Sequence, residues 1–545
     1  MTERTVPFVT AGRRKWWGWG VEGAGPSPEQ ARAIAQTVAG RFGVAVEPRP
    51  PPRLEELALR APRIRPPAAL AAIVSDEPEA RAGHHYGKSY RDVVRAFRRE
   101  LPSPPDQVAF PSSEAEVAAV LDWCDGAGIT VVPYGGGSSV VGGVETAIPG
   151  ASKVLSLDLG RLDRVLELDR TSRAARIQAG VLGPALEDQL RPHGLTLRHF
   201  PQSFEFSSLG GWIATRSGGH YATLYTHIDD FVESLRVLTP AGVVATRRLP
   251  ASGAGPAPDR LFIGSEGILG VITEAWMRLQ DRPRFRAGAS VRFDGQEGFL
   301  RGAEAVRRLS QSGLFPSNCR LLDPQEAATS GAGDGSHAVL VLGFESADHA
   351  LDAWLARALE LCRDAGGKVP QSAGRAERSA GSDDGPAGAW RRAFLQAPYV
   401  RDVLVACSVI AETFETAVSW DRFPEFHRYV MAATRDAVKR VCGSGTVACR
   451  FTHVYPDGAA PYYSVLAPAR PGSELEQWAE IKAAASEALL AGGGTITHHH
   501  AVGRDHRPGY DRERPDAFAE ALRAAKRALD PRGILNPGVL IDPAA

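Results

Sequence analysis

The stretch Ile129-Thr-Val-Val-Pro-Tyr-Gly-Gly-Gly-Ser-Ser-Val-Val-Gly-Gly143 is the most informative part of this sequence. A β-branched run leads to Pro133, and residues 133–143 then hold five glycines and two serines. The pattern predicts a buried strand that ends in a loop. Because glycine has no Cβ, several backbone N–H groups of such a loop can point into one concavity, which suits a diphosphate. Ser138 and Ser139 would add hydroxyl donors.

The two commonest phosphate-binding loops do not match this stretch. No lysine follows the glycines, so the GxxxxGK[ST] loop of nucleotide triphosphatases is absent. The spacing of Gly135 and Gly137 also lacks the later glycine that opens a Rossmann helix. On this segment alone, a tight turn between two strands is as good an interpretation as a ligand-binding loop.

The composition is ordinary for a water-soluble globular protein. The chain has 545 residues, 43% of them hydrophobic and 23% charged, which is enough for two or three domains. Lys+Arg and Asp+Glu both number 63, and this zero net charge argues against nucleic acid as the main partner. The six cysteines form no C-x-x-C pair, which favours a reduced, cytoplasmic protein. No apolar run reaches the roughly 18 residues of a membrane span, so we expect neither a signal peptide nor a spanning helix.

Changes in composition and in the predicted pattern of strands and helices divide the chain into four parts. We expect an N-terminal extension at 1–103, a first domain at 104–282, a second domain at 283–500, and a C-terminal helix and turn at 501–545 that return to the first domain. Short strands alternating with helices predict a mixed α+β fold. The elements we expect are helices at 31–42, 117–125, 183–189, 350–366 and within 514–545, strands at 129–133, 153–158, 175–179 and 338–343, and a loop at 371–388.

The N-terminal extension carries the aromatic motif Lys15-Trp-Trp-Gly-Trp-Gly20. We interpret it as a strap laid across the main body, and contact with lipid headgroups, where tryptophan is enriched, is the alternative. Ser27 followed by Pro28 matches the chemistry of a helix start. Seven prolines between Glu47 and Pro67 predict a semi-rigid connector with one short helix.

Two further segments are rich in small residues, Phe200–His220 and Gly264–Glu274. Their glycines and serines would let a flat ligand lie close to the backbone. Each segment alone is explained equally well by turn chemistry. Three Gly- and Ser-rich loops that recur through one half of the chain are better explained by one extended ligand that all three share.

These motifs, with a closing Asp-Pro-x-Gly-Ile-Leu-Asn-Pro-Gly at 530–538, together resemble the FAD-binding domain of the vanillyl-alcohol oxidase / p-cresol methylhydroxylase (PCMH) flavoproteins. The resemblance covers residues 11–540. It implies an α+β protein with a two-subdomain PCMH-type FAD-binding domain, an α/β substrate-binding cap domain and an N-terminal helical extension.

Within that superfamily, the chain resembles the alkyldihydroxyacetonephosphate synthase family of ether-lipid enzymes. The motifs that carry this likeness are Lys15–Gly20, Arg320-Leu-Leu-Asp323, Glu412-Thr-Phe-Glu-Thr416, Trp420-Asp-Arg422 and Gly492–Gly503.

The resemblance implies that FAD binds across both halves of the first domain. Its diphosphate would lie at the first small-residue loop, its ring and ribityl chain along the second, and its adenine half beside the third. Some relatives bond the flavin covalently through a histidine. The first loop has no histidine, so we predict dissociable, non-covalent FAD. His220, in the second loop, is the histidine to test for such a bond. The implied cofactor-binding residues are Pro133, Tyr134, Gly135, Gly136, Gly137, Ser138, Ser139, Gln202, Ser203, Phe204, Glu205, Phe206, Ser207, Ser208, Thr215, Arg216, Ser217, Gly218, Glu266, Gly267, Ile268, Leu269, Gly270, Val271 and Ile272.

Three adjacent histidines, His498, His499 and His500, follow a Gly-rich turn. Neighbouring side chains of an extended segment point to opposite faces and rarely converge on one ion, so we predict no metal site. Imidazoles with a pKa of about 6.5 can donate to a phosphate and transfer protons. The resemblance supports this use, as a surface for an anionic substrate.

Tyr462 lies at or beside the position of the family's catalytic tyrosine, with Tyr463 as the other match. A phenol with a pKa of about 10 is a poor base unless cations lower that pKa, which Arg320 and the histidines could do. A tyrosine on a core strand is the structural alternative. The family match of Arg320 implies a fixed charge that holds phosphate or carboxylate, although a lone arginine on a strand is usually solvated or salt-bridged.

The implied reaction exchanges the acyl chain of acyl-dihydroxyacetone phosphate for a long-chain alcohol without net redox, with FAD as electron sink. Tyr462 would remove a proton from C1, and His499 would help the alcohol to add. The lipid chains would need a tunnel that opens toward a membrane, so peripheral membrane contact is expected, and a homodimer is left open. The alternative is a FAD-dependent 2-hydroxy-acid or alcohol oxidoreductase, such as a D-lactate or glycolate dehydrogenase, because fold does not fix function.

Overall fold

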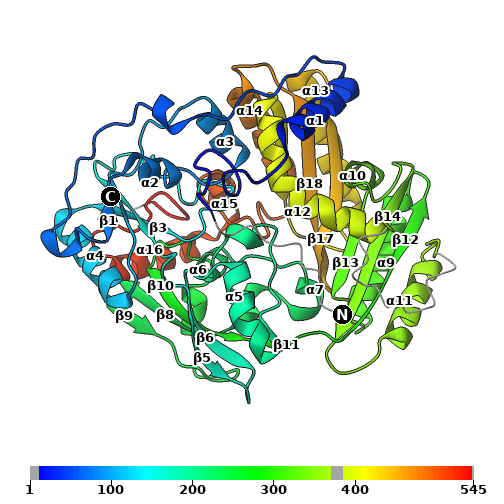
Figure 1. Cartoon of the computed structure of the whole chain (residues 1–545). Coiled ribbons are helices and arrows are strands. Elements are labelled where there is room, and N and C mark those ends of the chain that lie inside the picture. The colour runs from blue at the N-terminus through cyan, green and yellow to red at the C-terminus, as the bar shows by residue number, and fades with distance from the viewer. Residues whose placement is uncertain (1–11, 370–384, 543–545) are drawn as a thin grey trace.

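The structure is a computed structural model that describes residues 12–369 and 385–542. In this part of the chain the strands form four sheets. A four-stranded, a five-stranded and a small two-stranded sheet build one half of the molecule, and a seven-stranded sheet builds the other half (Figure 1). The mixed α+β class predicted from the sequence is confirmed.

The first sheet carries the Gly-rich stretch on its edge strand. Its order is β1 (Val74–Ser75), β2 (Gln107–Ala109), β4 (Val154–Asp158) and β3 (Thr130–Tyr134). Helix α4 (Glu114–Ala127) begins after Ser113, whose side chain accepts a hydrogen bond from the N–H of Glu116. Val131 of β3 and Leu155 of β4 are fully buried against this helix. The loop therefore leaves a strand that is fixed by its pairing with β4 and by its packing against α4.

The second sheet is antiparallel and carries the other two small-residue loops. Its order is β5 (Val165–Asp169), β6 (Ala174–Gln178), β10 (Val271–Arg278), β8 (Val232–Thr239) and β9 (Gly242–Ala245). The adjoining elements are α5 (Gly183–Leu190), α6 (Leu209–Ala214), α7 (Ala222–Tyr225), α8 (Ile228–Phe231), the paired strands β7 (Leu195–Thr196) and β11 (Gln280–Asp281), and 3-10 turns at Arg191–His193, Phe204–Phe206 and Pro258–Leu261. Trp212 of α6 is buried in the core beneath this sheet.

The third large sheet has seven antiparallel strands. Its order is β12 (Phe285–Asp294), β14 (His337–Ser346), β13 (Asn318–Leu322), β17 (Thr446–Val454), β18 (Gly458–Pro468) and β15 (Val409–Glu415), and β16 (Val418–Ser419) pairs with β18. Helices α9 (Gly298–Gln311), α11 (Asp352–Asp364), α13 (Phe423–Cys442) and α14 (Glu474–Ala491) belong to the core on one face. Helices α10 (Pro324–Ser330) and α12 (Gly385–Ala406) cover the other. Residues 385–388, which we expected in a loop, begin α12, and residues 371–384 lie outside the described part.

The N-terminal segment is a strap that joins the two halves, as the sequence predicts. The backbone N–H of Trp19 donates to Asp402 of α12 at 2.7 Å, and the Trp19 ring meets the Phe206 ring edge-on at 5.7 Å. A Cβ on Gly18 would lie 2.5 Å from the Asp402 carboxylate, and a Cβ on Gly20 would lie 2.6 Å from the Tyr399 ring. The glycines of the Trp-Gly-Trp-Gly motif thus let the strap approach α12 closely.

After the strap, α1 (Pro28–Phe42) packs against α12, and a 3-10 turn at Leu54–Glu56 lies within the proline-rich connector. The side chain of Ser27 accepts the N–H of Gln30, so the predicted helix start is confirmed. Further elements are a 3-10 turn at Ala68–Leu70, α2 (Pro78–Gly83) and α3 (Tyr90–Phe97).

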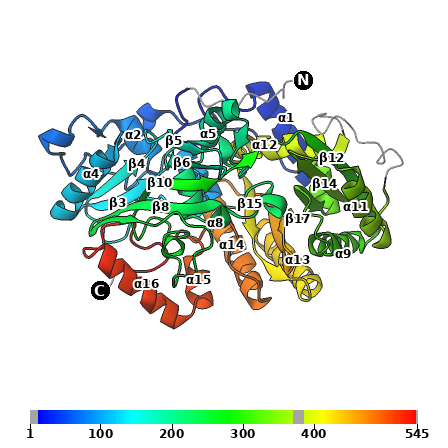
Figure 2. The ribbon, with the colours of Figure 1, turned by 90° about the horizontal axis from the view of Figure 1, so that it is seen from below.

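The C-terminal segment returns to the first sheet through α15 (Arg507–Glu513) and α16 (Asp516–Leu529), drawn in red in Figure 2. The N–H of Val131 donates to the carbonyl of Ile534 at 2.8 Å, and the N–H of Asn536 donates back to Val131 at 2.9 Å. The Asn536 side chain also donates to the carbonyls of Gly143 and Glu266. The last residues therefore lie beside β3 and hold two of the small-residue loops together.

Candidate active site

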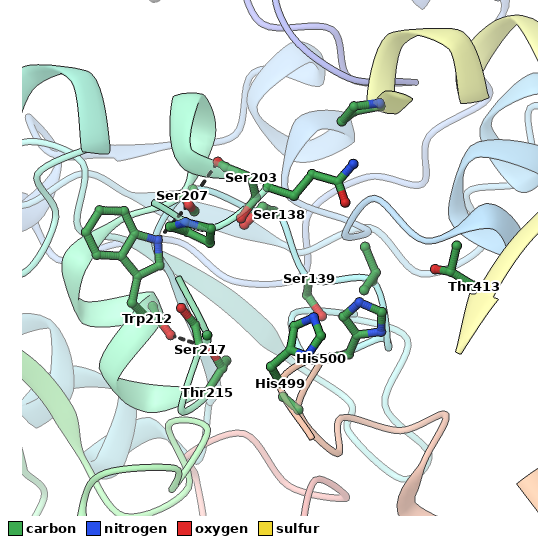
Figure 3. A pocket seen from close by; sticks show the side chains of 18 of the residues that line it. Ser138, Ser139, Ser203, Ser207, Trp212, Thr215, Ser217, Thr413, His499 and His500 are labelled. Carbon is green, nitrogen blue, oxygen red and sulfur yellow. Dashed lines mark hydrogen bonds between the residues drawn. The ribbon is translucent and has the colours of Figure 1, made fainter. Parts of the chain in front are cut away.

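The three small-residue loops meet at one cavity of about 610 Å³, which also reaches the α12 face of the seven-stranded sheet. Figure 3 shows side chains from the first two of these loops, Thr413 and the histidine segment around the same space. The predicted cofactor residues that line it are Pro133, Tyr134, Gly135, Gly136, Gly137, Ser138, Ser139, Gln202, Ser203, Ser207, Ser208, Thr215, Ser217, Gly218, Glu266, Gly267, Gly270, Val271 and Ile272.

Six predicted cofactor residues do not line this cavity: Phe204, Glu205, Phe206, Arg216, Ile268 and Leu269. Ile268 and Leu269 are buried in the core of the second sheet. Arg216 instead donates to Asp229 at 2.8 Å, and the Glu205 carboxylate accepts the hydroxyl of Tyr399 at 2.9 Å. The family motifs are continuous stretches, so they include side chains that point to both faces of each loop. Only one of these faces borders the cavity.

The Gly-rich loop has free backbone donors. Among the described residues, the N–H groups of 136–139 donate no hydrogen bond to a protein atom. Gly137 has a φ of 67°, a conformation that suits glycine, and the Ser139 hydroxyl accepts the N–H of Gly143 at 2.9 Å. Unpaired N–H groups at a cavity wall fit an anionic diphosphate.

The second loop is fixed by hydrogen bonds behind the cavity wall. The indole N–H of Trp212 donates to Ser207 Oγ at 2.7 Å, and Ser207 donates to the carbonyl of Ser203 at 2.8 Å. Gly218 lets His453 of β17 approach, since a Cβ there would lie 2.6 Å from the His453 ring. His453 also lines the cavity, and the sequence did not single it out.

The third loop anchors the segment that follows the three histidines. Its buried carboxylate, Glu266, accepts the N–H groups of Val502 and Gly503, both at 2.8 Å. Burial raises the pKa of Glu266 to about 7, and the two hydrogen bonds oppose this shift. Glu266 therefore links the third small-residue loop to the segment that follows the three histidines.

The adjacent tyrosines Tyr462 and Tyr463 face opposite sides of β18. Tyr462 lines the cavity, whereas Tyr463 is fully buried in the opposite core, where its ring stacks on Phe414 at 4.9 Å. In the register of the sheet, Tyr462 pairs with Arg450 on β17 and with Glu415 on β15. The strand neighbours of Tyr462 are thus one cation and one anion.

The cation beside Tyr462 is Arg450, which the sequence analysis missed. The Arg450 guanidinium carbon lies 4.0 Å from the centre of the Tyr462 ring, and Arg450 donates to Glu326 at 2.5 Å. Burial raises the pKa of Tyr462, while Arg450 opposes that rise. Desolvation thus outweighs the nearby positive charge, and the phenol does not have the lowered pKa that neighbouring cations could have given it. An arginine between Cys449 and Phe451 on an apolar strand was the only signal in the sequence.

Glu415 organises the three histidines; the sequence analysis quoted it only within the motif Glu412–Thr416 and gave it no role. Its fully buried carboxylate accepts the N–H groups of His498 at 2.7 Å, His499 at 3.2 Å and His500 at 3.0 Å, and the hydroxyl of Thr497 at 2.6 Å. Burial raises the pKa of Glu415, but its interaction and hydrogen bond with the His499 side chain outweigh burial and hold that pKa well below its usual value. The segment is a curled loop rather than an extended strand.

Because the loop is curled, neighbouring histidines do not diverge as we expected. The Nδ1 atoms of His498 and His499 lie 3.2 Å apart, and one ring nitrogen each of His453, His498 and His499 lies within 4.8 Å of the others. These three are the residues of this site that could hold a metal ion. His498 also contacts the Tyr455 hydroxyl at 2.9 Å, and burial lowers the pKa of His498 to about 3. His499 and His500 line the cavity.

Arg320 is a buried cation without a carboxylate partner. Its Nη2 donates to His220 Nδ1 at 2.8 Å, and its guanidinium carbon lies 4.5 Å from the Trp390 ring centre. Its Nε and Nη1 have no hydrogen-bond partner, and no carboxylate of the described residues lies within 4.0 Å. Burial lowers the pKa of Arg320 to about 9, with Arg450 adding to the effect. Unpaired donors on a cation at a cavity wall fit an anionic ligand.

Two family models match the chain, one described as "FAD binding domain" at residues 105–247 and one as "FAD linked oxidases, C-terminal domain" at residues 282–540. Fold and site thus define a FAD-binding flavoprotein of the FAD-linked oxidase class. The alkyldihydroxyacetonephosphate synthase of Dictyostelium discoideum is 30% identical, over 86% of this chain and 78% of that protein. That of Trypanosoma brucei brucei is 28% identical, over 97% and 92%. The chain belongs to the alkyldihydroxyacetonephosphate synthase family.

A solved structure of an alkyldihydroxyacetonephosphate synthase has the same fold, with a TM-score of 0.79 at 24% identity. The match covers 96% of this chain and 98% of that chain.

Proposed function

We propose that this chain replaces the acyl chain of an acyl-dihydroxyacetone phosphate by a long-chain alcohol, releasing a fatty acid and forming an ether. The observation that carries the proposal is a single cavity with free diphosphate donors at one side, the unpaired cation Arg320, and an apolar arm beneath α12. We further propose the domain limits 104–282 and 283–500 for the flavin and substrate parts.

The residues of the small-residue loops would hold FAD. Residues 136–139 would donate backbone N–H groups to the diphosphate, and the wall from Ser203 to Gly218 would lie along the ring. FAD would supply an electron sink for the carbon skeleton during the exchange. We propose that FAD binds non-covalently. This is supported by His220, because its Nδ1 atom already accepts a hydrogen bond from Arg320.

Arg320 would bind the phosphate or the departing carboxylate of the substrate. Its planar fork keeps two donors, Nε and Nη1, free of protein partners. A bound anion would also pair with the buried charge of Arg320. Substrate binding would therefore offset the free-energy cost of burying this charge without a partner. The rings of Trp390 and Phe394 hold the guanidinium in place, with their centres 4.5 Å and 5.5 Å from its carbon.

Tyr462 would accept the proton that leaves C1 of the substrate. Because the pKa of its phenol is raised, Tyr462 carries its proton at neutral pH and must first transfer it. The rings of His499 and His500 lie 6.0 Å and 5.4 Å from the Tyr462 ring, centre to centre. Burial keeps the pKa of His500 well below its usual value, so this imidazole is neutral and a weak base, and the Glu415 carboxylate is the neighbour that favours its protonation. The departing fatty acid would carry away the hydroxyl proton that the alcohol loses as the ether bond forms, and C1 would regain a proton in place of the one removed.

The alternative function is oxidation of a 2-hydroxy acid or alcohol, which the "FAD linked oxidases" model also accommodates. In that case Arg320 would bind the substrate carboxylate and a histidine would be the base. Incubating the purified protein with acyl-dihydroxyacetone phosphate and labelled hexadecanol tests the proposal. We expect a labelled ether product, with flavin absorbance restored after turnover. Stoichiometric anaerobic bleaching by D-lactate or glycolate, without ether product, would favour the alternative.

We propose a cytoplasmic location with peripheral membrane contact. No described helix is long and apolar enough to cross a membrane. The six cysteines are all unpaired, which fits a reducing compartment. Co-sedimentation with phospholipid vesicles tests the membrane contact, and the mass of the purified protein in solution tests a homodimer.

A further inference from the structure

A histidine lies between the second small-residue loop and the unpaired cation of the site. His220 ends that loop just before α7, and its backbone N–H donates to the carbonyl of Phe200 at 2.8 Å. Its imidazole lines the cavity and reaches β13, where Nδ1 accepts a hydrogen bond of 2.8 Å from Nη2 of Arg320. His220 therefore links a loop of the proposed flavin site to the arginine proposed to bind the substrate anion.

The hydrogen bond to Arg320 fixes which nitrogen of His220 carries the proton. A guanidinium has donors only, so Nδ1 must present its lone pair. Burial and the charge of Arg320 keep the pKa of His220 well below its usual value, so the ring is neutral and its single proton is on Nε2. That N–H needs an acceptor, because a buried donor without a partner is costly.

The side chain of Asn318 supplies this acceptor. Asn318 shares a face of β13 with Arg320, two residues away, and its side-chain amide lies 3.2 Å from His220 Nε2. The oxygen of this amide is buried and has no other partner among the described residues. The two ends of an amide are assigned from their hydrogen bonds, and with the oxygen toward His220 both groups are satisfied. Asn318 thus holds His220 in the tautomer that accepts from Arg320.

Aromatic rings hold the guanidinium of Arg320 but leave its direction open. Trp390 and Phe394 stack with their centres 5.0 Å apart, and the guanidinium carbon lies 4.5 Å from the centre of the Trp390 ring. A cation above a ring face can turn at little cost, because the attraction is to the face as a whole. The hydrogen bond to His220 removes this freedom, so the unpartnered Nε and Nη1 become a fork of fixed direction.

We propose that His220 is a positioning residue that directs the two free donors of Arg320 at the anionic group of the substrate. This inference rests on the proposed function, in which Arg320 binds a phosphate or carboxylate. His220 acts through Arg320 and need not touch the substrate itself. Asn318 supports this role by fixing the tautomer of the imidazole.

The test measures the binding of dihydroxyacetone phosphate to the FAD-loaded protein by isothermal titration calorimetry, so it needs no turnover. His220→Phe keeps an aromatic ring but removes the acceptor, and should weaken binding by about 10-fold. His220→Asn should bind within about three-fold of wild type, because its side-chain oxygen can replace Nδ1 as acceptor. In kinetic assays, His220→Phe should raise KM for the acylated phosphate and leave KM for hexadecanol unchanged.

A double-mutant cycle distinguishes positioning from a general structural effect. In the Arg320→Met background, His220→Phe should change the affinity by less than about two-fold, because the group that His220 positions is gone. The matched control is His427→Phe, which replaces an imidazole stacked on Phe423 in the opposite core. This control should leave the affinity for dihydroxyacetone phosphate unchanged.

The outcomes separate this inference from the proposed reaction. If the wild-type protein binds the phosphate, or D-lactate in the same titration, but forms no ether, the proposed reaction fails, yet the dependence on His220 and Arg320 should remain. Equal losses from His220→Phe in both backgrounds, or wild-type affinity in His220→Phe, would overturn the inference, provided that the variants retain flavin and remain folded. A wild-type protein that binds neither anion would overturn both this inference and the proposed role of Arg320.

Discussion

The buried carboxylate of Glu415 accepts a hydrogen bond of 2.7 Å from the backbone N–H of His498. Since the same carboxylate also accepts the N–H groups of the next two residues, one side chain of β15 fixes the curvature of the whole histidine loop. Glu415 also pairs in register with Tyr462. Glu415 of β15 therefore positions both the three histidines and the candidate base Tyr462.

Replacing Glu415 by glutamine should disorder this loop. A glutamine has one acceptor oxygen, and its amide N–H groups would face the donors of residues 497–500. We expect kcat to fall by about 100-fold and the free energy of unfolding to fall by about 1–3 kcal/mol. Steady-state kinetics and urea denaturation measure both. Glu487→Gln, which removes one side of an exposed ion pair with Arg512, is the matched control and should change neither value appreciably.

The stabilisation from Glu415 should disappear in acid. Its pKa in the folded protein lies well below the usual value of 4.5, so the folded state binds its proton less readily than the unfolded state. The stabilisation is therefore fully present above about pH 5 and is lost as pH falls through the folded pKa. The difference in unfolding free energy between wild type and Glu415→Gln should be constant near neutral pH and shrink on acidification. A difference that grows toward low pH would contradict this assignment.

Tyr462→Phe should abolish most of the exchange activity, whereas Tyr463→Phe should not. Loss of a general base costs about 10²- to 10⁴-fold in rate. Tyr463 lies in the opposite core, with its hydroxyl 3.5 Å from His427 Nδ1, so its replacement should affect stability more than kcat. Exchange of the C1 proton of the substrate with solvent isolates the step. Equal rates of proton exchange in the two variants would exclude Tyr462 as the base.

Arg320→Met and Arg198→Met should behave in opposite ways. Both arginines are buried, but Arg198 is paired with Glu345, to which its Nε donates at 2.7 Å. Arg198→Met would leave that carboxylate unpaired and should cost about 3–5 kcal/mol of stability. Arg320→Met removes an unpaired charge, so stability should not fall, while KM for the phosphorylated substrate should rise by about 30-fold or more. Thermal unfolding and initial rates distinguish the two.

Removal of FAD should lower stability and be reversible. Acid precipitation should release the flavin into the supernatant, and yellow colour retained by the precipitate would show a covalent bond instead.

Gly136→Ala should prevent reconstitution with FAD, because its Cβ would lie 1.7 Å from the carbonyl oxygen of Phe206. Gly126→Ala, inside helix α4 with open space around it, is the control. This control should bind FAD normally and gain about 0.5–1 kcal/mol of stability.

The features that the sequence predicted are those whose chemistry is local. The cap at Ser27 and the glycine-rich loop after β3 depend on a few consecutive residues, so a pattern is enough to find them. Glu415, Arg450 and His453 lie on strands, and their function depends on which strands are neighbours. The register that places Arg450 and Glu415 on either side of Tyr462 joins segments that no local pattern relates. For the same reason, the stretch 266–272 was assigned whole, although Ile268 and Leu269 belong to the core.

The contact between β3 and the C-terminus has a consequence for biosynthesis. Val131 exchanges backbone hydrogen bonds with Ile534 and Asn536, about four hundred residues later in the chain. A ribosome that has completed the first two sheets still holds the residues that lie beside the strand carrying the cofactor loop. Proteins generally fold from the N-terminus during synthesis, domain by domain. Here the flavin pocket can close only after residues 534–536 have been synthesised, so a nascent chain stalled before Ile534 should be unable to acquire its cofactor.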